Sequence, residues 1–133
     1  MPADSRSTAL KLSMLWIFVM LNFFARDLHE LARPGVLEQM MSGTFDGVKI
    51  TEELMLLGGI MFEVPMLMVI LSLLLDRPLN RWVHAFAVLF TAGTILMNNT
   101  NPDLDNLFFM VVQLAALSSI SYLAWNWRAK LET

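Results

Sequence analysis

The stretch LSMLWIFVMLNFFARDLHELARPG, residues 12–35, decides how this chain is read. Residues 12–25 are apolar apart from one serine and one asparagine. At about 1.5 Å per residue they cover only about 21 Å of the roughly 30 Å that a membrane span must cross. The next seven residues include Arg26 and three further residues that can carry charge. With them the helix reaches the length of a span, so we expect one transmembrane helix over about 10–32 with its charges on one interior side.

The composition is typical of a membrane protein. The 133 residues are 56% hydrophobic and 16% charged, with a mean hydropathy of +0.58, whereas an average soluble domain is about 25% charged. The net charge is −3 and no basic cluster occurs, which argues against nucleic-acid binding. Cysteine is absent, which excludes thiol redox chemistry and thiolate metal sites. We expect a single domain over residues 1–133 with no cofactor, metal or catalytic residue, and we favour a non-enzymatic protein.

Four long apolar segments alternate with short polar breaks. They predict an all-α fold, a four-helix transmembrane bundle with up-down topology. The expected spans are about 10–32, 53–75, 81–98 and 106–128. A soluble bundle would need a polar stripe on every helix, whereas the segment 54–75 is interrupted only by Glu63.

The polar breaks contain helix-capping residues. Thr51, Asn80 and Asp103 precede the second, third and fourth apolar segments, where their side chains can cap helix N-termini. In the first loop, RPGVLEQMMSG (residues 33–43) has a proline near its start and a glycine past its end, which together frame a short amphipathic helix. We expect this helix to lie on the membrane surface or over the mouth of the bundle.

The positions of lysine and arginine predict the orientation, because cytoplasmic loops carry an excess of both. With a cytoplasmic N-terminus, the inner side holds six basic residues: Arg6, Lys11, Arg77, Arg81, Arg128 and Lys130. The outer side holds three: Arg26, Arg33 and Lys49. We therefore expect a multi-pass protein of the bacterial inner membrane with both termini cytoplasmic. A basic start before an apolar segment is also typical of a signal peptide, but cleavage after Ala25 would place bulky Phe23 where a small residue is needed.

Projection at about 100° per residue places the polar side chains of each helix on one face. The four faces are Asn22, Arg26, His29 and Arg33; Glu52, Leu56, Gly59 and Glu63; His84, Ala87, Thr91, Thr94 and Asn98; and Asn106 with Gln113. Because lipid does not accommodate polar groups, we expect these faces to converge on an interior that is more polar in its outer half.

Glu63 is the most informative single residue in this projection. It lies near the bilayer midplane, where a carboxylate costs several kcal/mol unless it is paired or protonated. Pro65 should kink the helix beside it, and Arg26 is its natural partner. Two interpretations stay open: a binding or proton-handling site, or an ion pair that fixes the bundle geometry. The candidate ligand-binding residues are Arg26, Glu63, Asn22, His29, Glu30, Asn98 and Gln113.

The two histidines lie on opposite sides of the predicted membrane. His29 is near the outer end of one helix and His84 near the inner end of another, about 20 Å or more apart, which excludes a bis-histidine haem between them. His29 with Glu30 and the aspartates of the last loop could form a metal site, but solvated caps and loop charges explain these residues better. His84 fits a position near the inner interface, with a proton relay as the alternative.

Several short motifs resemble a known family. RDLHELARPG, ITEELMLLGG with EVP, NRW, DLDNLFF and AWNWR occur in this order over residues 10–129. They resemble small bacterial four-helix membrane proteins without an assigned function and, more loosely, the DoxX-like membrane proteins. That resemblance implies the topology and, because some DoxX-like proteins serve as quinone-linked oxidoreductase subunits, a possible redox partner. It implies no catalytic residues.

Three functions follow as hypotheses. The first is a bundle that holds a small ligand, ion or proton in a polar pocket of its outer half, using Arg26 and Glu63. The second is a quinone-interacting subunit of a membrane oxidoreductase, and the third is a structural or regulatory membrane subunit. The expected partners are the lipid bilayer, a small hydrophobic or ionic ligand, and a second copy or another membrane subunit.

Overall fold

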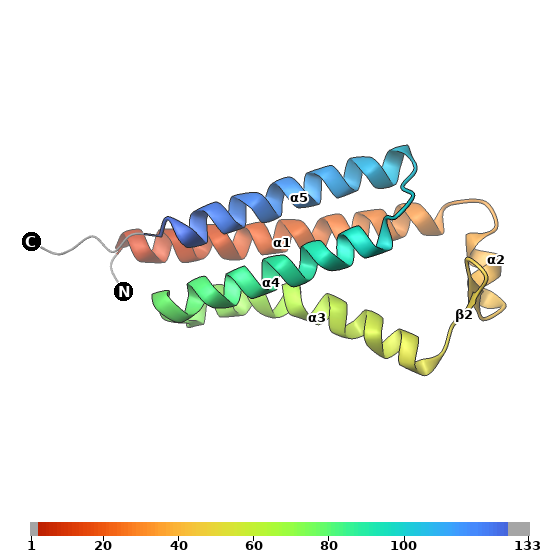
Figure 1. Cartoon of the computed structure of the whole chain (residues 1–133), viewed down its shortest axis with the longest axis horizontal. Helices are drawn as coiled ribbons and strands as arrows, with labels where there is room; N and C mark the ends of the chain where they lie inside the picture. The colour runs from red at the N-terminus through yellow and green to blue at the C-terminus, as the bar shows by residue number, and fades with distance from the viewer. Residues whose placement is uncertain (1–2, 128–133) are drawn as a thin grey trace, which may run out of the picture.

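Within residues 3–127, which the computed structural model describes, the chain forms four long helices, one short helix and a two-stranded hairpin. The long helices are α1 (Ala3–Leu31), α3 (Glu52–Leu74), α4 (Arg77–Asn98) and α5 (Leu104–Trp125). They run alternately up and down and pack in the ring order α1–α3–α4–α5, so that each contacts two neighbours (Figure 1). We call the end at which α1 ends and α3 begins the loop end. The opposite end, at which α1 begins and α5 ends, is the terminal end.

Two of the three predicted helix caps are confirmed. The Thr51 side chain accepts a hydrogen bond from the Leu54 amide at 3.2 Å, and Asp103 accepts one from the Asn106 amide at 3.3 Å. The predicted cap at Asn80 is wrong, because α4 begins three residues earlier, with Asp76 as its N-cap. A proline in the first helical turn loses no intrahelical hydrogen bond, so the Asp-Arg-Pro turn can start the helix itself.

The first loop contains the predicted short helix, α2 (Val36–Met41), and a hairpin that the sequence analysis did not predict. The hairpin pairs β1 (Thr44–Phe45) with β2 (Val48–Lys49) in antiparallel register. Asp46 and Gly47 between the strands both have positive φ, at 48° and 78°. Asp-Gly is a strong signal for such a two-residue turn, so the sequence did contain a signal for this hairpin.

Three helical segments of the described chain are long and apolar enough to cross a membrane: Ser5–Leu31, Glu52–Leu74 and Leu104–Trp125. The helix α4 has 22 residues but is not among them. Its buried face carries Asn80, His84, Thr91 and Thr94, which lower its mean hydropathy. The helical fold is therefore confirmed, whereas a bundle of four membrane-spanning helices stays a prediction.

The predicted spans differ from the helices mainly where the helices begin. The helix α1 starts at Ala3 and not near residue 10, and α4 starts at Arg77 and not near residue 81. The predicted end of the last span at residue 128 lies outside the described residues, as do Arg128 and Lys130 of the basic-residue count.

The packing is uneven along α3. All buried residues of α3, which are Pro65, Met68 and Ser72, lie in its second half. Every residue from 51 to 57 is exposed, and Figure 1 shows the beginning of α3 sloping away from the other helices. The proline lies where the packed half begins and cannot donate a hydrogen bond to the carbonyl of Met61, which weakens the helix at that point. The bundle is consequently packed at the terminal end and open at the loop end.

Candidate functional site

A polar network joins the end of α1 to the beginning of α5. The Nε of Arg26 donates a hydrogen bond to the Oδ1 of Asn106 at 2.9 Å. The Nδ2 of Asn106 donates in turn to the Oε2 of Glu30 at 3.3 Å. Arg26 and Glu30, one helical turn apart on α1, are therefore joined through an asparagine that lies 80 residues from Arg26 in the chain.

Arg33 continues this network toward the surface. Its Nη2 contacts the carboxylates of Asp103 and Asp105, the second at 2.8 Å, and its Nε lies 3.5 Å from Glu30. The hydrogen bonds to Asp105 and Asp103 raise the pKa of Arg33 above its ordinary value, so this side chain stays charged. Arg33 therefore ties the two helices together at a partly solvated position.

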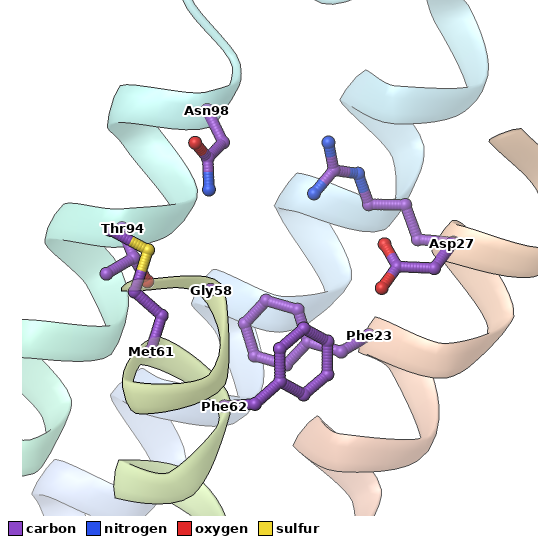
Figure 2. A pocket seen from close by; sticks show the side chains of 8 residues that line it. Phe23, Asp27, Gly58, Met61, Phe62, Thr94 and Asn98 are labelled. Carbon is purple, nitrogen blue, oxygen red and sulfur yellow. The ribbon is translucent and has the colours of Figure 1, made fainter. Parts of the chain in front are cut away.

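A cavity of about 120 Å³ lies directly beneath this network, between α1, α3 and α4. Its lining residues are Phe23, Arg26, Asp27, Gly58, Met61, Phe62, Thr94 and Asn98. Figure 2 shows the carboxylate of Asp27 and the amide of Asn98 pointing into this space from opposite sides, with the rings of Phe23 and Phe62 below them. The two ring centroids are 5.4 Å apart. The cavity thus has a charged and polar upper part over an aromatic floor.

Two larger cavities adjoin this one at the loop end. One of about 340 Å³ lies against the α4–α5 loop and the hairpin, and one of about 380 Å³ lies between α1, Met40 of α2 and Phe45 of the hairpin. Arg26 lines all three cavities. Among the described residues its guanidinium makes one hydrogen bond, through Nε, so both terminal nitrogens are available at the point where the three cavities meet.

Three of the seven predicted site residues come together here: Arg26, Glu30 and Asn98. The other four do not line these cavities. The Asn22 amide donates to the carbonyl of Phe18 on its own helix. His29 is 61% exposed, with Nε2 3.6 Å from the Oδ2 of Asp105, and Gln113 is buried on α5.

The predicted pairing of Arg26 with Glu63 is wrong. Glu63 is exposed, and it has no hydrogen bond or ion pair within the part of the chain that the structure describes. The packing of Pro65, Met68 and Ser72 decides which face of α3 is buried. At about 100° per residue Glu63 projects roughly 140° to 180° from these side chains, so it turns outward. The remainder of its stripe, Glu52, Leu56 and Gly59, is exposed as well.

The polar face predicted for α4 does point inward. His84, Ala87, Thr91 and Thr94 are buried, and Asn98 continues this face to the open loop end. On α5, Gln113 is also buried, and within residues 3–127 neither its amide nitrogen nor its oxygen has a hydrogen-bond partner.

Asp27 lines the cavity but was not among the predicted site residues. Phe23, Arg26, Asp27 and Glu30 stand at positions i, i+3, i+4 and i+7, the spacing of one helix face, and this was the available signal. Among residues 3–127, no three histidine or carboxylate side chains are grouped so that they could hold a metal ion.

The family of this chain is shown by comparison with known families. A family model described as a family of unknown function (DUF6326) matches residues 4–133, and the chain belongs to that family. This agrees with the expectation of a family without an assigned function, and the match gives no link to the DoxX-like proteins. No curated protein and no solved structure shows significant similarity to the chain.

Proposed function

We propose that this member of the family is a multi-pass membrane protein, with both termini cytoplasmic, that binds the oxyanion group of a small amphiphilic ligand at its loop end. Three apolar helices of sufficient length support the membrane assignment. The excess of basic residues on the side of the termini supports the orientation.

The position of Arg26 carries this proposal. Its Cα lies five residues before the end of α1, about 7.5 Å inside the helix end at 1.5 Å per residue. A cation at such a depth is costly unless it meets an anion or faces a polar cavity. Because only Nε is engaged, the two terminal nitrogens keep the planar, forked geometry that pairs with a carboxylate or phosphate through two parallel hydrogen bonds.

The size of the cavity favours a headgroup over a ring. An apolar cavity of about 150 Å³ is large enough for benzene, and the cavity beside Arg26 between α1, α3 and α4 has about 120 Å³. A carboxylate or phosphate group is small enough for this volume, whereas a substituted quinone ring would have to extend into the adjoining cavities. The hydrocarbon part of the ligand would extend along the exposed apolar side chains at the beginning of α3, such as Leu54 and Leu57.

Native mass spectrometry of the detergent-solubilised protein tests this proposal with two probes, palmitate and dioleoylphosphatidylglycerol. We expect Arg26→Gln to weaken binding by about tenfold or more, because a charge-assisted hydrogen bond contributes about 1.5–3 kcal/mol. Arg81→Gln is the matched control, since Arg81 lies against Trp125 at the terminal end. Asn106→Ala removes the structural partner of Arg26 but keeps its charge, and it should retain binding.

Which of the two probes binds shows whether the ligand carries a carboxylate or a phosphate. Binding of palmitate alone identifies a carboxylate ligand, and binding of the phospholipid alone identifies a phosphate headgroup; both support an oxyanion site if Arg26→Gln reduces them. Equal loss in Arg26→Gln and Arg81→Gln, or no binding of either probe, would contradict the proposal.

A further inference from the structure

A second polar cluster lies at the terminal end, separate from the cavities around Arg26. His84 on α4 is 1% exposed and stands 14 residues before Asn98, about 21 Å along the helix. Its ring lies 6.2 Å from that of Trp16 on α1. Ser72 on α3 and Asn80 on α4 complete the cluster, and both are fully buried.

The hydrogen bonds fix one proton on the imidazole of His84. Its Nδ1 lies 2.9 Å from the backbone carbonyl oxygen of Asn80. A carbonyl oxygen only accepts hydrogen bonds, so Nδ1 carries a hydrogen and donates it. The protonation of the ring is therefore decided at Nε2 alone.

The partner of Nε2 can serve both protonation states. Nε2 lies 3.2 Å from the Oγ of Ser72, and this hydroxyl is also within hydrogen-bond distance of the Met68 carbonyl. When the ring is neutral, the hydroxyl donates to Nε2. When the ring is an imidazolium, Nε2–H donates to Oγ, and the hydroxyl turns to donate to the Met68 carbonyl. Rotation of one hydroxyl thus satisfies both states without movement of the backbone.

We propose that His84 is a proton-binding site inside the membrane bundle, with Ser72 as its alternating donor and acceptor. A proton is taken up at Nε2 from a water molecule and returned to water by the reverse step, so no bond other than N–H and O–H is made or broken.

Within residues 3–127, none of the other charged and titratable side chains near the cluster is bonded to His84, so the proton is bound at His84 itself. Among the side chains that the structure describes, those on the terminal halves of the surrounding elements are Arg6 and Lys11 on α1, Asp76 after α3, Arg77 and Arg81 on α4, and Tyr122 on α5. Within the described chain, none of them is hydrogen-bonded or ion-paired to His84.

The interior face of α4 carries polar side chains between His84 and the loop end. Oγ1 of Thr91 is buried and has no hydrogen-bond partner within the described residues, and internal water binds to groups of this kind. Thr94 donates to the Thr91 carbonyl at 2.8 Å and also lines the cavity beside Arg26. Water bound on this face would carry protons between the loop-end cavity and His84.

Nitrogen NMR of the histidine rings tests the proposal, because the chain has only two histidines. In protein labelled with ¹⁵N-histidine and placed in lipid nanodiscs, His29→Asn leaves His84 as the one labelled ring. We expect the Nδ1–H form at high pH and the imidazolium at low pH, reversibly, while circular dichroism shows an intact helical fold.

Substitution of Ser72 shows whether the hydroxyl takes part. Ser72→Ala removes the hydrogen bond at Nε2 in both protonation states, and because the bond of the charged ring is the stronger of the two, proton binding should weaken by about fivefold. Ser119→Ala is the control, since that hydroxyl on α5 bonds only its own helix and is exposed. A His84 ring that keeps one neutral form over the whole range in which the protein stays folded would overturn the proposal. An unchanged titration in Ser72→Ala would do so as well.

Discussion

The two ends of the bundle handle polar side chains in opposite ways. At the terminal end, Ser72, Asn80 and His84 are buried in a packed interior, and each makes at least one hydrogen bond to another of them or to a backbone carbonyl, although Oδ1 of Asn80 has no partner within the described residues. At the loop end, Arg26, Asp27 and Asn98 line a cavity, and the exposed first half of α3 diverges from the other helices. Burial demands that polar groups be paired, whereas a cavity lets them stay available to a ligand. The comparison indicates that the terminal end holds the fold together and that the loop end is where a ligand can bind.

The largest expected effect is on the free energy of unfolding, when one aromatic residue at each end is replaced by alanine. Trp16→Ala should lower the free energy of unfolding by about 3–5 kcal/mol, because a fully buried ring is lost from a packed core. Phe62→Ala should cost only about 1 kcal/mol, since that ring is half-buried and contacts mainly Phe23 and Phe24. Unfolding by SDS in bicelles measures both values. Equal losses would show that the loop end is as tightly packed as the terminal end.

A smaller effect is expected for the asparagine at the α3–α4 turn. The Nδ2 of Asn80 donates to the carbonyls of Ser72 and Leu75, at 3.1 and 3.4 Å. Asn80→Ala leaves these acceptors without that donor and should cost about 1–2 kcal/mol in the same unfolding measurement. Asn126→Ala is the matched control, because that exposed amide bonds only to Tyr122 on the adjoining helix, and its loss should be close to zero. An equal loss of unfolding free energy in Asn126→Ala and Asn80→Ala would contradict the stabilising role of the buried Asn80 amide.

Replacement of Pro65 tests the cause of the opening and should change geometry more than stability. Pro65→Ala restores a donor to the Met61 carbonyl and should straighten α3. Residue 56 is nine residues from Pro65, about 14 Å, so removal of a bend of about 20° would move it by about 5 Å. Because the chain has no cysteine, spin labels on cysteines introduced at the exposed positions 56 and 111 report this distance. An unchanged distance would mean that Pro65 does not cause the divergence.

The sequence predicted what depends on local chemistry and missed what depends on distant contacts. The caps at Thr51 and Asp103 and the inward face of α4 follow from short-range spacing, and they were predicted correctly. The outward position of Glu63 depends on how the second half of α3 packs, which helical projection of one segment cannot show. Likewise, the bond between Arg26 and Asn106 joins positions 80 residues apart, and no local pattern indicates it. The role of the predicted ligand-binding residues stays a proposal.

The smallest effect is expected for the surface part of the loop-end network. Arg33→Gln removes the contacts with Asp103 and Asp105, but these groups are partly solvated and surface ion pairs contribute little. Thermal unfolding at low salt should therefore show a small decrease in midpoint, and the decrease should disappear near 1 M salt, where charges are screened beyond about 3 Å. The decrease should not change between pH 8 and 9, because the neighbouring carboxylates keep the pKa of Arg33 above its ordinary value. Arg33 lies at the rim, whereas Arg26 lies within the helix, so Arg33→Gln should reduce binding of the oxyanion probes less than Arg26→Gln does. If Arg33→Gln abolished binding and Arg26→Gln did not, the ligand site would lie at the rim of the loop end and not in the cavity above the phenylalanine rings.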